Sequence, residues 1–497
     1  MRIPDNCVMV IFGASGDLTH RKLIPALYNL AVDGLLPRNF AVVGFARKPK
    51  TNESFREELL ESVKEHSRTK LSEDGKWAQF ASMLHYCQGD YSTPEDYEKL
   101  DAVLSQIDAD HGTEGNRLFY IATPPEVYPT ITEHLGTSAM GRPSGPGRWS
   151  RLIIEKPFGR DLKSARSLNE HVHKYFNEDQ LYRIDHYLGK ETVQNILVFR
   201  FANGIFEPIW NRRYVDSVQI TVAEEIGIET RGAYYESAGV IRDIVQNHLL
   251  QLLALTAMEP PSEFSADSVR NEKVKVLKAI RVDTSVGDGT VRGQYGPGKV
   301  GGQLVPGYVQ EAGVAVDSTT ETWLAMKFFV DNWRWAGVPW YIRSGKRMPK
   351  RVTEIAIQFK MPPLMLFSRA TARDIEPNEL VLNIQPDEGI SLRFGSKVPG
   401  TGENIQPVKM DFSYSSSFNK AAPEAYERLL LDCMLGDSTL FTRSDEVEAQ
   451  WQIINPVIEG WQSPNASSVD MYRAGTPGPK ESDDFIRKDK REWRRLW

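Results

Sequence analysis

The chain has 497 residues, of which 41% are hydrophobic and 25% charged, and its formal net charge is −6. That composition predicts a globular protein of two or three domains and argues against a nucleic-acid coat or a membrane-surface protein. No stretch approaches the roughly 18 apolar residues that span a bilayer, and no signal peptide is visible. Cys7, Cys87 and Cys433 lie far apart without metal-type spacing, so we expect a cytoplasmic protein with no disulfide framework and no metal site.

Strands alternate with helices in the first part of the chain. Cys7–Phe12 is a short apolar run that ends in Gly13, and a helical pattern follows it until Gly34. Later strand candidates are residues 41–45, 118–122 and 152–154. This alternation predicts a parallel sheet with helices on both faces. Residues 136–147, rich in Gly, Ser and Pro, are expected to form an inserted surface loop.

The pattern changes after about residue 200. Ile390, Leu392 and Phe394 alternate with polar neighbours, as is typical of an antiparallel sheet with one wetted face. Other strand candidates are residues 218–222, 322–330, 355–359, 380–384 and 408–414. We therefore predict an α/β domain over residues 1–184 and an α+β domain with a large, mostly antiparallel sheet over 185–497.

A glycine-containing turn joins the first strand to the first helix. Its residues are Gly13, Ala14, Ser15, Gly16, Asp17 and Leu18. Glycines let the backbone approach a pyrophosphate, and the helix N-terminus supplies free N–H groups and the positive end of its dipole. The turn departs from the G-x-G-x-x-G pattern, so a purely structural turn is the alternative. The strand–turn–helix context favours a cofactor site and a Rossmann-like dinucleotide-binding fold.

Two cations follow the second strand. NAD enzymes place an acid there to bind the ribose 2′-hydroxyl, whereas this chain has Arg47 and Lys48. A cation suits a 2′-phosphate, so NADP is the predicted cofactor. The alternative is a solvated basic pair.

The run Arg183–Glu191 is the most informative stretch. If a helix begins near His186, then His186 and Lys190 share one of its faces, and its N-terminus with Tyr187 makes a phosphate site. Gly189 leaves room for close approach, and Asp185 lies outside the helix, free to pair with a base. A helix cap followed by solvated side chains is the alternative.

A second helical pattern runs from about residue 239 to 258. His248 falls in its apolar stripe, which fits either a core histidine or a general base oriented by a buried carboxylate. Asp243, five positions earlier, lies about 140° around an α-helix from His248 and cannot be that carboxylate by spacing.

Several motifs together resemble glucose-6-phosphate dehydrogenase and keep that family's order along nearly the whole chain. They are residues 13–18, Glu155–Gly159, Arg183–Glu191, Arg242–His248, Arg343–Lys346 and Asn378–Val381. The run with Asp185 and His186 is the family's signature.

The resemblance implies a role for each candidate residue. His248 would be the general base toward the sugar O1 hydroxyl, and Asp185 would orient it. The implied phosphate ligands are His186, Tyr187, Lys190 and Lys346. Glu224 and Asp243 would accept hydrogen bonds from sugar hydroxyls, and Arg351 is a further substrate-binding candidate. Lys156, before an expected cis bond to Pro157, would lie between sugar and cofactor, Arg47 would contact the 2′-phosphate, and Asp90 and Tyr91 would edge the cofactor cleft.

The implied reaction is oxidation of glucose 6-phosphate at C1 to 6-phosphogluconolactone, with hydride transfer to NADP. The alternatives are an NADP oxidoreductase for another sugar and a non-catalytic NADP- or sugar-phosphate-sensing homologue. We expect a homodimer or homotetramer joined through the large sheet, with no nucleic-acid or membrane partner. The animal enzymes' second, structural NADP site has no matching residues here and is not expected.

Overall fold

The computed structural model describes residues 2–71, 75–143, 145–282, 289–364, 366–367, 375–400, 404–418, 423–463 and 466–496. They form two compact units. Unit 1 comprises residues 1–190, 263–270 and 423–448, and unit 2 comprises 191–262, 271–422 and 449–497. No single boundary in the sequence separates the two units, because two later segments of the chain belong to unit 1. The predicted boundary between residues 184 and 185 stays a prediction.

Unit 1 is built on a six-stranded parallel sheet with the order β3-β2-β1-β4-β5-β6. The strands are β1 (Cys7–Phe12), β2 (Phe40–Ala46), β3 (Leu84–Gln88), β4 (Arg117–Ile121), β5 (Ser150–Ile154) and β6 (Leu181–Arg183). β1 is buried along its whole length, as its unbroken apolar run predicts. The predicted Rossmann-like parallel sheet is therefore confirmed.

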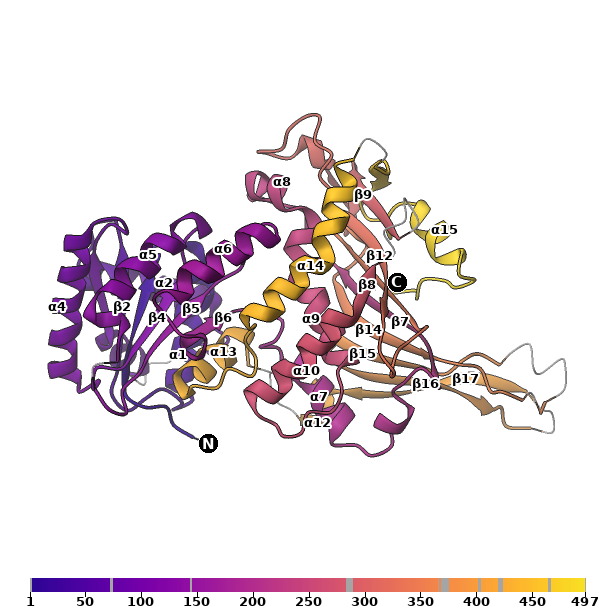
Figure 1. Cartoon of the computed structure of the whole chain (residues 1–497), viewed down its shortest axis with the longest axis horizontal. Coiled ribbons are helices and arrows are strands. Elements are labelled where there is room, and N and C mark those ends of the chain that lie inside the picture. The colour runs from indigo at the N-terminus through magenta and orange to yellow at the C-terminus, as the bar shows by residue number, and fades with distance from the viewer. Residues whose placement is uncertain are drawn as a thin grey trace. The chain divides into compact units, whose positions relative to one another are not determined.

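The helices of unit 1 lie on both faces of this sheet (Figure 1). They are η1 (Thr19–Leu23), α1 (Ile24–Val32), α2 (Asn52–His66), α3 (Lys76–Ser82), α4 (Pro94–His111), η2 (Pro125–Val127), α5 (Tyr128–Thr137), η3 (Ala139–Gly141), α6 (Leu162–His173), η4 (Glu178–Gln180) and α13 (Ala425–Leu435). Met9 and Ile11 of β1 share one core with Leu27 of α1, Phe55 of α2 and Leu430 of α13. α13 is also held by Glu427, whose carboxylate accepts hydrogen bonds from Asn29 and Arg68 at 2.8–2.9 Å.

The prediction of a surface loop over residues 136–147 is wrong at its start. Gly136 lies in the last turn of α5 and is buried, and Gly141 is buried in η3. A Cβ at Gly136 would lie 2.2 Å from the Cβ of Tyr175, so this glycine permits close packing. Composition alone does not distinguish a glycine required by packing from one required by a turn.

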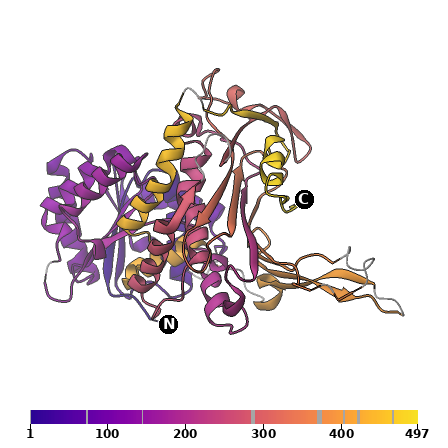
Figure 2. The ribbon, with the colours of Figure 1, turned by 45° about the vertical axis from the view of Figure 1, so that its right-hand side comes forward.

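Unit 2 is built on a ten-stranded sheet of the order β17-β16-β15-β14-β7-β13-β12-β9-β18, with β8 beside β12. Within the described part of the chain, β7/β13 and β9/β18 pair in parallel and the other pairs are antiparallel, so the predicted mostly antiparallel sheet is confirmed. The hairpin of β16 and β17 projects beyond the rest of the sheet (Figures 1 and 2). The strands are β7 (Val215–Ala223), β8 (Ile280–Val282), β9 (Thr290–Gly296), β12 (Trp323–Val330), β13 (Pro339–Gly345), β14 (Val352–Phe359), β15 (Glu379–Gln385), β16 (Gly389–Lys397), β17 (Ile405–Ser413) and β18 (Asp470–Arg473), with a separate ribbon of β10 (Gly298–Val300) and β11 (Gln303–Val305).

The remaining helices belong to unit 2 or continue into it. They are α7 (Glu191–Phe201), η5 (Glu207–Ile209), α8 (Gly232–Val240), η6 (Ile241–Leu249), α9 (Leu250–Ala257), α10 (Ala266–Ala279), η7 (Tyr308–Gln310), α12 (Tyr414–Phe418), α14 (Ser444–Trp461) and α15 (Glu481–Arg487). Among the helices that the structure describes, none combines the length and apolar character needed to cross a membrane.

Candidate functional site

The glycine turn lies at the point where the strand order of unit 1 reverses. β2 and β3 lie on one side of β1, and β4 to β6 on the other. Ligands of such sheets bind at the carboxyl ends of the strands at this point. Gly13 has φ +90°, and a Cβ there would lie 2.4 Å from the carbonyl oxygen of Ala122, which follows β4. Only glycine therefore allows the chain to cross from β1 to the helix so close to β4.

The predicted cofactor residues after β2 and β3 lie together with this turn. The charge of Arg47 acts on both Asp90 and Tyr91, and the Tyr91 hydroxyl lies within hydrogen-bonding reach of the Gly13 backbone. Hydrogen bonds from Ser92 lower the pKa of Asp90, with a smaller effect from Arg47, whereas burial raises the pKa of Tyr91. Arg47 itself is exposed, so its guanidinium is accessible to a phosphate.

Lys156 is anchored through its neighbour Glu155. The Glu155 carboxylate accepts hydrogen bonds from the hydroxyls of Tyr120 at 2.5 Å and Tyr426 at 3.0 Å, and its carbonyl accepts one from Tyr128. Burial raises the pKa of Glu155, while the two hydroxyls and the charge of Lys156 oppose that shift. The Lys156–Pro157 bond is cis, as expected. No local sequence pattern predicts this tyrosine–carboxylate cluster, because Tyr426 lies 271 residues from Glu155 in the chain.

The run after β6 is not the predicted helix. Residues 186–190 form successive turns, with Leu188 N donating to Asp185 O and Lys190 N to Tyr187 O, and α7 begins only at Glu191. The Asp185 carboxylate accepts a hydrogen bond from Tyr187 N at 2.9 Å, an Asx turn that competes with a helix. Gly189 makes a close approach to α13 rather than leaving an open space, since its Cβ would lie 2.6 Å from Ala425 O.

The turn still brings the predicted phosphate residues of unit 1 together. The Lys190 ammonium lies 3.9 Å from the centre of the Tyr187 ring, and the His186 ring is 5.1 Å from that ring. Tyr187 and Asp185 are buried, whereas His186 and Lys190 are only partly covered. The geometry therefore differs from the predicted helix face, but the same side chains cluster.

The carboxyl ends of β7 and β13 gather a second group of predicted residues in unit 2. Lys346 Nζ lies 2.6 Å from Glu224 Oε2 and 3.9 Å from Asp243 Oδ2. Tyr234 donates a hydrogen bond to Asp243 at 3.4 Å, and Arg231 lies 3.8 Å from the same carboxylate. This cluster of one ammonium and two carboxylates can donate to and accept from neighbouring sugar hydroxyls.

Arg351 lies at the same end of the sheet. Val352 pairs with Ala223 in the antiparallel register of β14 and β7, so the residue before it stands opposite Glu224. Its guanidinium donates to Gln385 Oε1 at 3.0 Å and is exposed.

The helix with His248 is not an α-helix. Residues 241–249 form the π-helix η6, which follows a kink at Gly239 (φ +57°) near the end of α8. A π-helix bonds residue i to residue i+5, so residues five apart lie above one another. The inferred 140° separation of Asp243 from His248 is therefore wrong, and the two side chains lie on the same side of η6. Both are buried, with exposed fractions of 3% and 1%.

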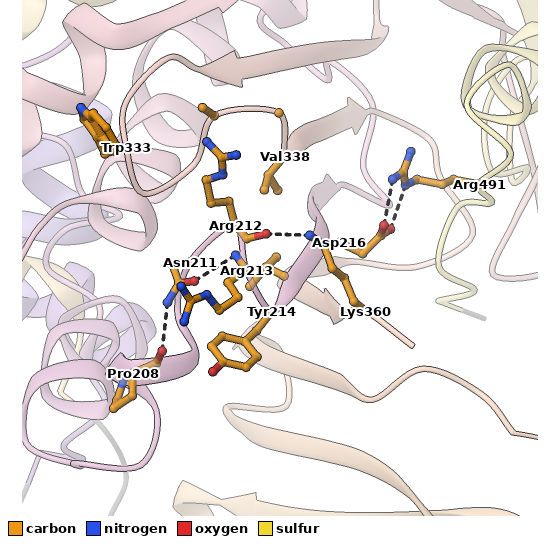
Figure 3. Close-up of a pocket in the computed structure, with 13 residues that line it drawn as sticks. Pro208, Asn211, Arg212, Arg213, Tyr214, Asp216, Trp333, Val338, Lys360 and Arg491 are labelled. Atoms are coloured by element: carbon orange, nitrogen blue, oxygen red, sulfur yellow. Dashed lines mark hydrogen bonds and ion pairs between the residues drawn. The ribbon is translucent and has the colours of Figure 1, made fainter. Parts of the chain in front are cut away.

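A cavity of about 880 Å³ lies elsewhere in unit 2 (Figure 3). It is lined by residues before and at the start of β7, by the loop before β13, and by Lys360 and Arg491. It contains none of the predicted site residues. Glu224, for example, follows the far end of β7, and the two ends of this strand are separated by nine residues at roughly 3.3 Å each. Arg491 forms a two-bond ion pair with Asp216 at 3.0 Å at this cavity. The predicted site therefore lies outside this cavity.

Comparisons with known proteins cover nearly the whole chain. Two family profiles match, "Glucose-6-phosphate dehydrogenase, NAD binding domain" over residues 10–195 and "Glucose-6-phosphate dehydrogenase, C-terminal domain" over 197–494. Glucose-6-phosphate 1-dehydrogenase 2 of Mycobacterium tuberculosis is 49% identical over 494 residues, 99% of this chain and 95% of the relative. A glucose-6-phosphate dehydrogenase solved in complex with glucose 6-phosphate is 37% identical, with a TM-score of 0.91 and full coverage of both chains. The Mycobacterium avium enzyme is 35% identical, with a TM-score of 0.85 over 99% of both chains.

Proposed function

The chain belongs to the glucose-6-phosphate dehydrogenase family, and we infer from its residues how it oxidises glucose 6-phosphate with NADP. It is an oxidoreductase that converts D-glucose 6-phosphate to 6-phospho-D-glucono-1,5-lactone, the first step of the oxidative pentose phosphate pathway. The observation that carries this conclusion is the end-to-end match to enzymes of one activity, including a structure with that substrate bound. Neither a sensing homologue nor an enzyme for another sugar is favoured.

The direct test is absorbance of the reduced nicotinamide, followed with glucose 6-phosphate and either coenzyme. We expect rapid reduction of NADP with glucose 6-phosphate and little with unphosphorylated glucose. Binding of both ligands without reduction would indicate a sensing homologue instead. Equal rates with glucose and its phosphate would contradict the proposed phosphate site.

The proposed chemistry assigns proton removal to His248. NADP, when bound, would supply the acceptor for the hydride of C1. His248 takes the proton of the O1 hydroxyl, so that the C1–O1 bond becomes a carbonyl as the hydride leaves. Asp185 is the proposed partner that orients the imidazole and stabilises its charged form. Both residues are buried, which keeps water away from the charge that develops.

Binding is proposed to use the clusters described above. His186, Tyr187, Lys190 and Lys346 hold the phosphate, because cations and a hydroxyl match its oxygens. Glu224 and Asp243 accept bonds from the sugar hydroxyls, with Arg351 at the edge of the same site. The pairing of Lys346 with both carboxylates also suits it to orient them.

The turn at Gly13 fits a dinucleotide, because it has no room for a side chain on Gly13 at the switch point. Residues 13–18 would hold the pyrophosphate, with Asp90 and Tyr91 beside them and Lys156 toward the nicotinamide. Arg47 would contact the 2′-phosphate.

Replacing Arg47 by Ala is expected to raise the Michaelis constant for NADP roughly ten- to a hundredfold, and that for NAD much less. The reason is that only NADP carries the phosphate this guanidinium would contact. Steady-state kinetics with both coenzymes provide the measurement, and Lys64→Ala, at an exposed cation of α2 outside the proposed site, is the control. Equal losses for the two coenzymes would refute the assignment.

We also propose that two copies of the chain associate through the hairpin of β16 and β17. β17 is the edge strand of the sheet, and Met410 and Val408 are 61% and 39% exposed on it. Exposed apolar edge strands commonly mark an interface. Nearby, Phe418 is 61% exposed as well.

Replacing Met410 by Asp is expected to shift the chain from dimers to monomers, because a charge would then be buried without a partner. Sedimentation equilibrium measures the mass, with Lys409→Ala as the neighbouring control. An unchanged mass for Met410→Asp would place the interface elsewhere.

The proposed cytoplasmic location agrees with the state of the thiols. Cys7, Cys87 and Cys433 are buried and form no disulfide. Burial raises the pKa of Cys7 to about 12 and that of Cys87 to about 11, so both thiols are weak nucleophiles.

A further inference from the structure

A buried carboxylate outside the predicted site meets the start of the helix that carries Asp243 and His248. Glu321 precedes β12 and is 7% exposed. Its carboxylate accepts a hydrogen bond from Ile241 N at 3.3 Å, and its main-chain carbonyl accepts one from Val240 N at 3.0 Å. Two successive amides at the entry to η6 are thus bound by one residue from a different element.

Gly239 makes this contact possible. It adopts φ +57° at a kink within α8, two residues before η6 begins, and a Cβ there would lie 2.1 Å from Glu321 Oε1. Any side chain at residue 239 would displace the carboxylate, in addition to straining the backbone. The kink at Gly239 and the position of Glu321 therefore depend on each other.

The next residue ties Lys346 to the same segment. Lys346 N donates to Thr322 O at 3.0 Å. The Tyr472 hydroxyl donates to Lys346 O at 2.6 Å and lies 3.2 Å from the Thr322 hydroxyl. Glu321 and Thr322 together hold the helix with Asp243 on one side and the chain at Lys346 on the other.

We propose that Glu321 is a positioning residue for the substrate site: its carboxylate fixes the start of η6, and thereby the place of Asp243 and His248 relative to Lys346 and Glu224. This inference rests on the proposed function of those four residues. Glu321 is not one of the residues proposed to bind substrate or cofactor, and it acts through the helix whose first amides it binds. Small displacements of positioned groups lower rates strongly, because the reacting atoms must be aligned.

The charge of Glu321 depends on pH, because its burial and the charged groups that face it shift its pKa in opposite directions. Arg242 of η6 and Arg292 of β9 favour the ionised carboxylate, and the hydroxyl-bearing Tyr235 of α8 also lies within its electrostatic reach. Burial outweighs the arginines and raises the pKa of Glu321 from 4.5 to about 7. A proton therefore binds the folded state more tightly than the unfolded state, so the native state loses stability as pH rises from 4.5 to 7. A glutamine at residue 321 cannot ionise and escapes that loss.

The test compares Glu321→Ala and Glu321→Gln with a matched control, Glu354→Gln. Glu354 is a buried carboxylate of the same sheet that pairs with Arg494 rather than with a helix. For Glu321→Ala we expect kcat to fall roughly ten- to a hundredfold, a higher Michaelis constant for glucose 6-phosphate, and an unchanged one for NADP. Glu321→Gln should retain most of the rate, and its kcat ratio to the unaltered enzyme should change between pH 6 and 8. Its melting temperature relative to the unaltered enzyme should rise over the same range.

Hydrogen exchange separates this proposal from the proposed function. In Glu321→Ala, amides of residues 241–249 should exchange faster than in the Glu354→Gln control, whatever His248 does chemically. Unchanged exchange there would overturn the positioning role, even with His248 confirmed as the base. The role is equally refuted if Glu321→Ala only lowers the melting temperature and leaves kcat and both Michaelis constants at control values.

Discussion

Replacing His248 by Asn is expected to lower kcat by about 10²–10⁴, with glucose 6-phosphate binding and the fold nearly unchanged. The O1 hydroxyl is a weak acid, so the hydride can leave C1 only as a base takes the proton. Histidine suits this task because its unperturbed pKa is about 6.5. Asparagine keeps similar bulk and polarity in a buried position but cannot accept the proton. Turnover and melting temperature should be measured on the same sample.

The competing interpretation is that His248 is only a core histidine of η6. It predicts a lower melting temperature and near-normal turnover of the folded fraction. Gln246→Ala provides a matched control, since Gln246 is a buried polar residue of the same helix. If His248→Asn behaves like this control, so that activity is lost only in proportion to the unfolded fraction, the assignment of His248 as the general base is refuted.

The proposed pairing with Asp185 adds a second requirement. A carboxylate that orients a histidine acts on the rate through that histidine, so Asp185→Asn should reduce kcat while adding little to a His248→Asn background. Fully additive losses would mean that the two residues act independently. Asp185 would then serve mainly the turn in which it accepts a bond from Tyr187.

Local patterns predicted most of the sheets and less of the helices. Unbroken apolar runs located β1 and β4, because these strands are buried on both faces. Alternation located β16, which is partly buried, and β17, whose alternating apolar side chains are exposed or only partly buried. β13 has no such signal: it is buried throughout, yet Arg343 and Ser344 interrupt its apolar residues. Arg343 is accommodated there by Thr221 and the carbonyl of Arg494, which are contacts that no local pattern contains.

Helix geometry was the weaker part of the prediction. The same apolar stripe fits an α-helix and a π-helix, so the sequence did not show that Asp243 and His248 share a side. Likewise, the Asx turn at Asp185 replaced a predicted first helical turn before α7. In both cases the predicted residues were brought into clusters, but by a backbone conformation other than the one expected.

The supporting residues were the least predictable because their partners are distant in the chain. Tyr426 supports Glu155 from 271 residues away, and Glu321 meets Ile241 from 80 residues away. For Glu155 the sequence gives one indication of a supporting role, because this residue lies between a buried strand and the Lys156-Pro157 pair. Nothing in the sequence around Glu321 distinguishes it from an ordinary acid before a strand.

Replacing Lys190 by Ala is expected to lower kcat/KM for glucose 6-phosphate on the order of 10²-fold, because a charge that pairs with the phosphate is lost. The phosphate is remote from C1, and part of its binding energy can serve to align C1 with the base, so kcat is expected to fall as well as KM to rise. Steady-state kinetics with glucose 6-phosphate and with unphosphorylated glucose measure both effects. Glucose, which has no phosphate to lose, should be scarcely affected.

Two further variants separate charge from structure at this position. Lys190→Arg keeps the cation over the Tyr187 ring and should recover much of the activity, whereas Lys174→Ala removes an exposed lysine of unit 1 and should change nothing. If Lys190→Ala lowers activity toward both sugars by the same factor, Lys190 supports the turn after β6 instead of binding phosphate. The phosphate would then have to be held by His186, Tyr187 and Lys346 without it.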